Sequence, residues 1–281
     1  MARVSDETFA PPARGGLGAA SDAVRGLGRG IKGGGTLILL LIVWEAAARS
    51  GAVSAFLLPP FSVVMERVWD DTVSGDLAIN LAQTLYRMAV GFAISAVLGV
   101  VLGILIARSR VTRWFFDPII SVAFPMPKIA FLPVFMLWFG LYDASKITMI
   151  VFSAIFPVVT ATVTSTNGVE KELLWSARSL GASERRLLWE IVLPAALPQI
   201  LTGLQVALPV SMIVAVVTEI LMGGAGIGGA MIQASRFADS PGVFAGIIEI
   251  AVAGYVFVRG IAWTRRRLLV WHQEASEPST V

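Results

Sequence analysis

The side chains that most often carry out catalysis or hold metals are scarce in this sequence of 281 residues. It contains no cysteine, which excludes disulfides, cysteine nucleophiles and cysteine-based zinc sites. Its single histidine, His272, follows a cluster of arginines near the C-terminus, a place typical of a tail residue. So few candidate groups argue against an enzyme, and we expect no catalytic residue and no metal site.

One glycine-rich run formally matches a cofactor-binding fingerprint. GGAGIGG places Gly224, Gly226 and Gly229 in the pattern G-x-G-x-x-G. That pattern binds a dinucleotide only where it follows a strand within a βαβ unit, whereas this run follows a long apolar segment. We therefore interpret it as a tight turn or a close approach of helices, and we expect the chain to bind no cofactor.

The composition is that of a membrane protein. Hydrophobic residues make up 56% of the chain and charged residues only 15%, with a mean hydropathy of +0.77. A soluble domain usually carries about a quarter charged residues. The net charge of +3 is too small to indicate binding to nucleic acid. The lipid bilayer is therefore the solvent that this composition favours.

Apolar segments divide the chain into six candidate spans. A backbone exposed to lipid must satisfy its own hydrogen bonds, so these spans should be helices. The sequence thus predicts an all-α, polytopic membrane protein with six transmembrane helices. We expect a disordered tail over residues 1–35, a transmembrane domain over 36–272 and a short tail over 273–281. The spans are 36–48, 84–107, 117–140, 145–166, 195–222 and 243–263.

A few polar residues lie within these spans. Because a carboxylate in a bilayer is costly, Glu219 should face a protein interior or a wet cavity. Gln205, Met212 and Glu219 are spaced by seven residues, so they share one helix face, our candidate for a translocation path. Glu219 paired with a neighbouring helix at the outer interface is the alternative. Glu45 and Arg49, four residues apart, are expected to form a simple helix pair.

The third span contains a lysine among prolines. Pro125, Pro127 and Pro133 should interrupt or kink the helix, which membrane proteins tolerate where a broken helix lines a cavity. Lys128 could attract an anion there, and we include it in the candidate path. A lysine that reaches the interface without contacting a solute is an equal alternative.

Basic residues predict the orientation. They gather before the first span, after the second, between the fourth and fifth, and after the sixth, which are all on one side if six helices alternate. The positive-inside rule then places both termini in the cytoplasm. The basic residues are Arg14, Arg25, Arg29, Lys32, Arg108, Arg110, Arg113, Lys171, Arg178, Arg185, Arg186, Arg265, Arg266 and Arg267.

The segment 167–194 predicts two short helices joined by a sharp turn. Asn167 and Glu170 resemble a helix start, and Gly181 is placed to end that helix in a left-handed conformation. Ser183 can cap a second helix that runs toward Pro194. The first helix should carry one apolar stripe, formed by Val169, Leu173, Ala177 and Leu180. Such a segment could be a rigid projection that fits a soluble motor, or a helix lying on the lipid surface.

This segment resembles the EAA loop of ABC importer permeases, whose pattern is Glu-Ala-Ala, three residues, Gly, nine residues, Ile, any residue, Leu-Pro. Trp175, Ser176 and Ala177 stand in the first three places, and Gly181, Ile191, Leu193 and Pro194 fall in register. Trp175 departs from the acidic residue and Ser176 from the alanine. By this resemblance the ATPase-coupling loop comprises Trp175, Ser176, Ala177, Arg178, Gly181, Ala182, Ile191, Leu193 and Pro194.

Further similarity covers about residues 36–272. LPPFSVV, FPMPKIAFLPVFMLWFGLYDASKI and the stretch around TEILMGGAGIGG are similar to the nitrate, sulfonate, taurine and bicarbonate branch of these permeases. The resemblance implies a type I importer fold and a multi-pass subunit of the bacterial plasma membrane, surrounded by lipid. It also implies two permease copies as a homodimer, two ATP-binding subunits that hold ATP and magnesium, and an extracytoplasmic substrate-binding protein.

The implied function is import of a small anion such as nitrate, bicarbonate, taurine or another alkanesulfonate, driven by ATP hydrolysis on the partner subunits. The same machinery importing a pyrimidine-type vitamin precursor is the alternative. A secondary transporter or channel would predict inverted repeats with paired broken helices, which the sequence does not show. That rival also leaves the loop at 167–194 unexplained.

Overall fold

The computed structural model describes residues 35–268, and every residue assigned to regular structure there is helical. The predictions for the tails and for His272 lie outside the described residues, apart from Gly35. The chain divides into two compact units, one ending at Ser62 and one beginning at Val63, and each is described by itself.

In the first unit, a helix over residues 35–49 carries the first apolar run. It is shorter than the ~20 residues that a hydrocarbon core of ~30 Å requires. The predicted pair is confirmed, because Arg49 Nε lies 2.5 Å from Glu45 Oε1. Ser62 joins it, donating from its backbone N–H and its hydroxyl to the Glu45 carboxylate at 3.1 and 2.9 Å. These bonds close the connection after the helix.

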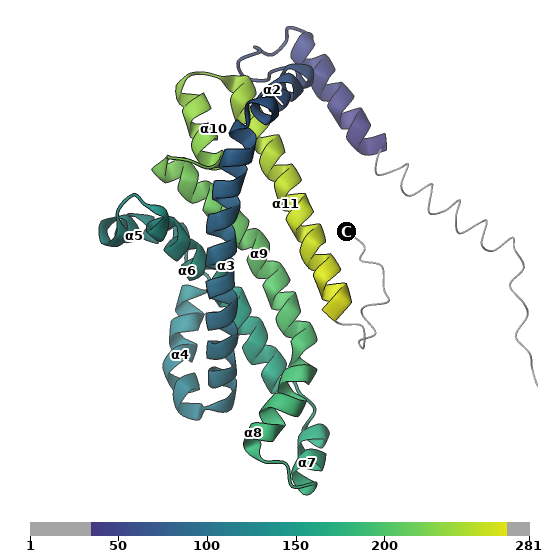
Figure 1. Cartoon of the computed structure of the whole chain (residues 1–281), viewed down its shortest axis with the longest axis vertical. Coiled ribbons are helices and arrows are strands. Elements are labelled where there is room, and N and C mark those ends of the chain that lie inside the picture. Colours follow the sequence, from purple (N-terminus) through teal and green to yellow (C-terminus); the bar gives the residue numbers. More distant parts are fainter. Residues whose placement is uncertain (1–34, 269–281) are drawn as a thin grey trace, which may run out of the picture. The chain divides into compact units, whose positions relative to one another are not determined.

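The second unit is a bundle of long helices (Figure 1). Its core consists of α3 (Asp76–Arg108), α6 (Asp143–Asn167) and α9 (Leu193–Met222), and α11 (Ser240–Leu268) packs on α9. The shorter elements are α2 (Phe61–Ser74), α4 (Arg110–Ala123), η1 (Lys128–Phe131), α5 (Leu132–Phe139), α7 (Lys171–Ser179), α8 (Glu184–Leu187), the π-helical segment η2 (Leu188–Val192) and α10 (Ile227–Arg236).

Small residues allow α3 and α6 to pack closely. Gly91, Ser95, Gly99 and Gly103 recur every fourth residue on α3 and are all buried. A Cβ added at Gly99 would lie only 2.8 Å from Cβ of Val158 on α6. In lipid, where water does not drive helices together, close van der Waals packing of this kind is a main source of helix association.

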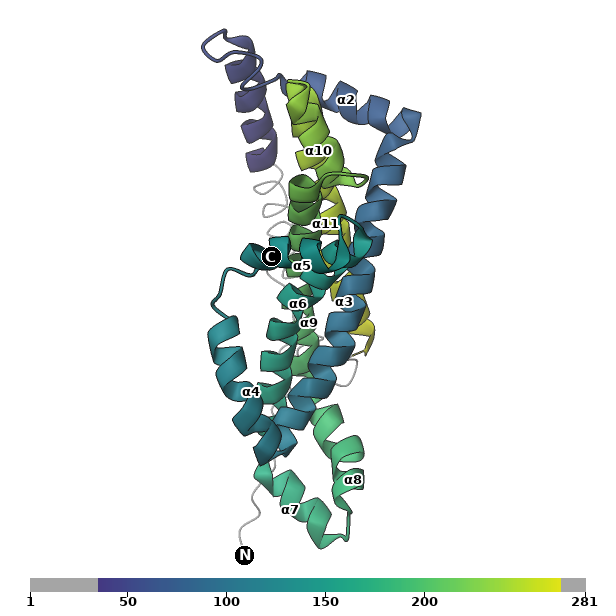
Figure 2. The ribbon, with the colours of Figure 1, turned by 90° about the vertical axis from the view of Figure 1, so that its left-hand side faces the viewer.

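Four helical runs of the described chain are long and apolar enough to cross a membrane, and a bent pair could supply a fifth. The predicted count of six spans therefore stays a prediction. The predicted third span, 117–140, is wrong as a single helix. α4 ends at Ala123, and the chain turns by 100° before the η1–α5 segment (Figure 2).

The prolines explain this break. Pro125 and Pro127 lie between the two helices, where each removes a backbone donor, as the sequence predicted. Pro133 does not kink a helix, because it lies in the first turn of α5, where its missing N–H costs nothing. Gly140 ends α5 with a φ of +72°.

The basic segments after α3 and between α6 and α9 lie at one end of the second unit. Arg108, at the end of α3, pairs with Glu184 of α8 at 2.9 Å, and Arg113 of α4 donates to Asn167 Oδ1 at 3.0 Å. Both views show α7 and α8 beyond this end of α3 and α6 (Figures 1 and 2). The alternation that the charge pattern required is therefore present for these segments.

The α3–α6 contact generates a first prediction. Gly99→Ala should destabilise the folded protein by about 1–3 kcal/mol, because the new methyl group overlaps Val158. The matched control is Gly254→Ala on α11, where an added Cβ meets nothing within 4 Å and the helix gains propensity. Thermal unfolding in detergent measures both. Equal melting temperatures for the two variants would contradict the close α3–α6 packing.

Candidate functional site

The segment after α6 forms the predicted pair of short helices. α7 ends at Ser179, and Gly181 follows with a φ of +81°, the left-handed conformation that the sequence predicted. Gly181 N–H donates to Arg178 O at 2.9 Å, and Ala182 N–H donates to Ala177 O at 3.0 Å. This is the pattern by which a glycine closes a helix C-terminus, and it fixes the direction of the turn.

The second helix begins as predicted and then continues further. Ser183 Oγ accepts a hydrogen bond from Arg186 N–H at 3.3 Å, and Glu184 lies in the first turn. Pro194 does not end this helix, because α8 passes through the wider η2 segment directly into α9. A π-helical turn before a proline relieves the clash of its ring with the preceding turn, which explains why the chain runs through.

The predicted start of the first helix is wrong. Asn167 is the last residue of α6, and α7 begins at Lys171 after Glu170, which makes no side-chain capping bond. The side chain of Asn167 instead accepts from Arg113, so the asparagine joins α6 to α4. Asparagine is favoured at a helix N-cap and also occurs at helix C-termini, so only the tertiary contact with α4 shows which role Asn167 has here.

The predicted apolar stripe is also divided. Val169 and Ala177 are buried, and Val169 packs with Val192 and Ala196, whereas Leu180 is 89% exposed. Leu174, rather than the exposed Leu173, reaches the cluster. The buried residues hold the two helices against the start of α9.

One carboxylate ties this segment to the bundle. Glu184 accepts from Arg108 at 2.9 Å and from Arg178, also at 2.9 Å. Of the residues of the predicted coupling loop, Ala177 and Gly181 shape the turn, while Ser176, Arg178 and Pro194 are exposed and Ala182, Ile191 and Leu193 are half-buried. Trp175 presents 60% of its surface. The segment is thus a firmly anchored projection with a partly apolar tip.

A second polar site lies at the opposite end of α9. Glu219 is fully buried, and its carboxylate accepts from Arg87 Nη1 at 2.6 Å and from the Thr84 hydroxyl at 2.8 Å. Arg87 also pairs with Asp143 at 2.8 Å. The cluster therefore joins α3, α6 and α9 inside the protein.

The same cluster holds the glycine-rich turn between α9 and α10. Lys146 Nζ donates to Gly223 O at 2.8 Å and Arg87 donates to Ala225 O at 2.6 Å. Asn80 accepts from Gly226 N–H at 3.0 Å, and Glu219 accepts from Gly228 N–H at 3.1 Å. A side chain at Gly226, where φ is +117°, would collide with the Glu219 carboxylate. The run is thus a tight turn, as the sequence analysis proposed.

The candidate path residues do not form one site. Glu219 is held in the ion pair, Met212 is buried in the core with Met88 and Ile150, and Gln205 accepts from Arg265 at 2.8 Å. A role of this face in translocation stays a prediction. The packing favours the alternative for Glu219, an ion pair between helices.

Lys128 lies apart from those three residues. Its ammonium donates to Phe124 O at 2.7 Å and lies 5.1 Å from the ring centroid of Phe156. Its role in attracting an anion also stays a prediction.

The partners of Glu219 were not predicted from the sequence. Arg87, Asp143 and Lys146 each lie at or inside an apolar span, and an ionisable residue in such a place is itself a signal of a functional or structural partner. Arg87 lies inside the predicted second span, so that signal was present in the sequence.

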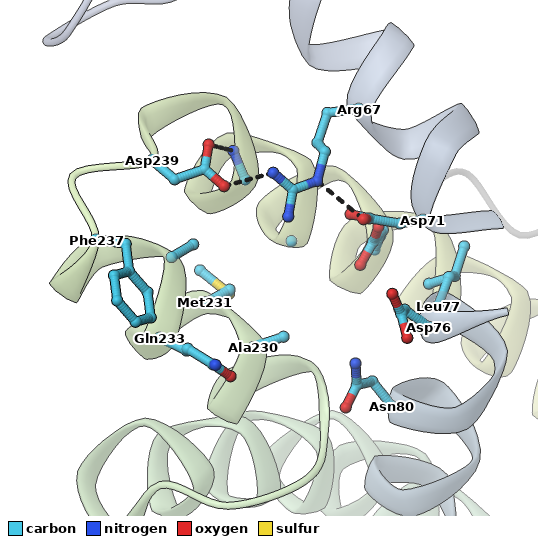
Figure 3. A pocket seen from close by; sticks show the side chains of 14 residues that line it. Arg67, Asp71, Asp76, Leu77, Asn80, Ala230, Met231, Gln233, Phe237 and Asp239 are labelled. Carbon is cyan, nitrogen blue, oxygen red and sulfur yellow. Dashed lines mark hydrogen bonds and ion pairs between the residues drawn. The ribbon is translucent and has the colours of Figure 1, made fainter. Parts of the chain in front are cut away.

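A cavity of about 400 Å³ lies among α2, α3, α10 and α11 (Figure 3). Arg67 of α2 crosses its mouth and donates to Asp71 at 2.9 Å and to Asp239. The hydrogen bond to Asp71 raises the pKa of the Arg67 guanidinium above its ordinary value. The described residues hold no group of three His, Cys, Asp or Glu side chains suited to a metal ion.

Comparison with known protein families identifies relatives of this chain. Residues 99–270 match the family described as the binding-protein-dependent transport system inner membrane component. The chain belongs to this family. It is 34% identical to the taurine transport system permease protein of Escherichia coli K12, over 85% of this chain and 89% of that protein. It is also 34% identical to a putative aliphatic sulfonates transport permease protein of Bacillus subtilis 168, over 83% of this chain and 84% of the relative.

Other relatives extend the comparison. A formylaminopyrimidine transport permease protein of Halalkalibacterium halodurans is 32% identical over 84% of this permease and 94% of its own length. Among solved structures, an amino acid ABC transporter with histidines matches 70% of this chain and 95% of its own, with a TM-score of 0.58 and 16% identity. The fold is that of ABC importer permeases, and the chain is a multi-pass permease of the nitrate, sulfonate and taurine branch.

The buried ion pair generates a second prediction. Glu219→Ala should destabilise the permease by about 3–5 kcal/mol, because it leaves Arg87 charged and without its buried partner. The matched control is Glu190→Ala, which removes an exposed pair with Arg186 and should cost less than about 1 kcal/mol. Thermal stability and the yield of monodisperse protein measure the effect. A Glu219→Ala variant with normal stability but altered uptake would instead assign Glu219 to the path.

Proposed function

We propose that this permease forms the path for a small organic anion of the taurine and alkanesulfonate class, and that ATP hydrolysis on partner subunits drives the import. Two relatives named for taurine and aliphatic sulfonates support the substrate class. Coupling to an ATPase subunit is supported by the anchored projection that α7 and α8 form, with its fixed turn at Gly181.

The projection has the properties that mechanical coupling needs. Its base is tied to α3 by the Glu184–Arg108 pair, and α8 continues through η2 into α9. A displacement of the tip is therefore passed to a helix that runs through the core. Trp175, Leu180 and Trp189 expose most of their surfaces, and these apolar groups suit burial in a groove of an ATPase subunit. Trp175 thus replaces an acidic contact by an apolar one.

The proposed assembly contains two copies of this permease, two ATP-binding subunits and an extracytoplasmic binding protein. Lipid surrounds the spans, and ATP and magnesium are bound by the ATPase subunits rather than by this chain. The switch between inward-open and outward-open states is a two-state equilibrium that nucleotide and loaded binding protein both bias. In this proposal, residues 36–272 form the permease domain, with the coupling loop at 167–194.

A second candidate substrate is a pyrimidine-type vitamin precursor. The relative named for formylaminopyrimidine supports it, at 32% identity. The two relatives named for sulfonates are more similar, so we favour the sulfonate class. Uptake of labelled taurine, an alkanesulfonate and a formylaminopyrimidine by the complete transporter distinguishes the two.

The end that carries α7 and α8 is proposed to face the cytoplasm, with both termini on that side. The native chain has no cysteine, so single cysteines report orientation cleanly. We expect Arg185→Cys, exposed on α8, to be protected from an impermeant thiol reagent in intact cells, and Gln233→Cys, exposed on α10, to react. Disruption of the membrane should make both react. The reverse labelling pattern would invert the topology.

The coupling proposal predicts that Gly181→Val uncouples the transporter. Valine strongly disfavours a φ of +81°, so α7 should point in another direction. The affinity of the ATPase subunit should then fall by at least about tenfold. The turn lies outside the candidate spans, so membrane insertion should be normal. The measurements are co-purification of the ATPase and its stimulation by loaded binding protein.

Gly181→Asn is the matched control, because asparagine tolerates the left-handed conformation. This variant should keep most of the coupling. If Gly181→Val coupled as well as the wild type, the segment would be a surface helix only, and the proposed coupling would fail.

A further inference from the structure

A second hollow lies next to the cavity in Figure 3 and shares part of its lining. Its volume is about 490 Å³, and its walls come from α3, from the glycine turn after α9 and from α10. Both spaces are bordered by Asn80 of α3, by Ala230 and Gln233 of α10, and by Phe237. The hollow lies at the Glu219 end of α9, away from α7 and α8. In the proposed orientation it opens toward the outside, where a binding protein releases its ligand.

The two spaces differ in charge. In the first, Arg67 is already held by Asp71 and Asp239, and Asp76 adds a third carboxylate, so the site disfavours an anion. In the second, Arg236 is the one charged side chain among the described residues of the lining. None of the described carboxylates pairs with Arg236. The second hollow therefore attracts anions and the first does not.

The polar side chains of the second hollow can all donate hydrogen bonds. The Asn80 side-chain oxygen accepts from Gly226 N–H at 3.0 Å. The amide N–H groups of Asn80 are therefore the ones available to a ligand. The exposed Gln233 amide stands on the same helix as Arg236. A guanidinium offers two parallel N–H groups that match the oxygens of a sulfonate or carboxylate. Donors of this kind recognise an oxyanion head group.

Apolar side chains complete the lining. Ile232 and Phe237 flank the polar groups, and Phe237 exposes 77% of its surface. An exposed aromatic ring beside a guanidinium provides a surface for a short carbon chain. Nitrate and bicarbonate have no such chain and would leave this surface unused.

We propose that this hollow binds an amphiphilic organic oxyanion, with its head group on Arg236 and its carbon chain against Ile232 and Phe237. The proposal rests on the proposed function and assigns to this hollow the recognition of both the oxyanion head group and the hydrocarbon part of its substrate. It assigns to the permease a selectivity of its own, separate from that of the binding protein.

The test measures binding to the complete transporter in nanodiscs, without binding protein and without ATP. Ligand-detected NMR titrations with ethanesulfonate and butanesulfonate report the affinity. Arg236→Gln should weaken both by at least about tenfold, the loss expected for a charge-assisted hydrogen bond. Arg236→Lys should recover part of the lost affinity.

The matched control is Arg259→Gln. Arg259 is an exposed arginine on α11 that packs on Tyr255 and lies outside the hollow, so this variant should bind as the wild type does.

Chain length tests the apolar wall. In the wild type, each added CH₂ should strengthen binding, by up to about fourfold if fully buried. Phe237→Ala should flatten this dependence while leaving methanesulfonate binding nearly unchanged. Competition by nitrate as strong as that by ethanesulfonate would contradict the amphiphilic site.

Three further results would overturn the proposal. The first is a wild-type transporter that binds no sulfonate, and the second is equal affinity for the wild type and Arg236→Gln. The third is unchanged sulfonate binding together with weaker capture of the binding protein by Arg236→Gln, which would make Arg236 a docking contact for that protein. The proposed function is tested separately by uptake and ATPase stimulation in the wild type, so its failure is distinguishable from failure of this site.

Discussion

The buried pair of Arg87 and Glu219 is the interaction on which the arrangement at one end of the bundle depends. A carboxylate with no exposed surface is stable only if a cation and hydrogen-bond donors satisfy it, and here they come from α3 and α10. The same arginine reaches Asp143 on α6 and the carbonyl of Ala225. One charge pair thereby sets the positions of three long helices and of the turn that leads to α10.

Close packing of small residues fixes the positions of the helices along the rest of the bundle. The small residues of α3 let its backbone approach α6, and Gly203 of α9 faces Ala161 of α6 in the same way. α6 therefore lies between two helices that it contacts over its length. A core packed this densely transmits displacement as rigid-body motion, since it cannot deform continuously. The projection formed by α7 and α8 at one end and the glycine turn at the other are joined by one continuous element, α9.

The two ends of this permease use different chemistry. At the α7–α8 end, a shared carboxylate and a glycine turn hold apolar side chains out toward a partner. At the Glu219 end, buried charges pair with one another and hold the glycine turn, and Arg236 remains without a carboxylate among the described residues. Stability is thus concentrated inside the bundle, while the groups left for recognition stand on short helices at its ends.

Composition and local signals in the sequence determined the membrane class, the helical content and the helix–turn–helix of residues 167–194. A left-handed glycine and a serine cap are decided by residues within one turn, which is why Gly181 and Ser183 were placed correctly. Tertiary structure decided the rest. Asn167 reads equally as a cap or a helix end until Arg113 is seen beside it, and Glu219 finds Arg87 132 residues away. A sequence shows that a buried charge requires a partner, but only the packing of helices distant in the chain determines which residue supplies it.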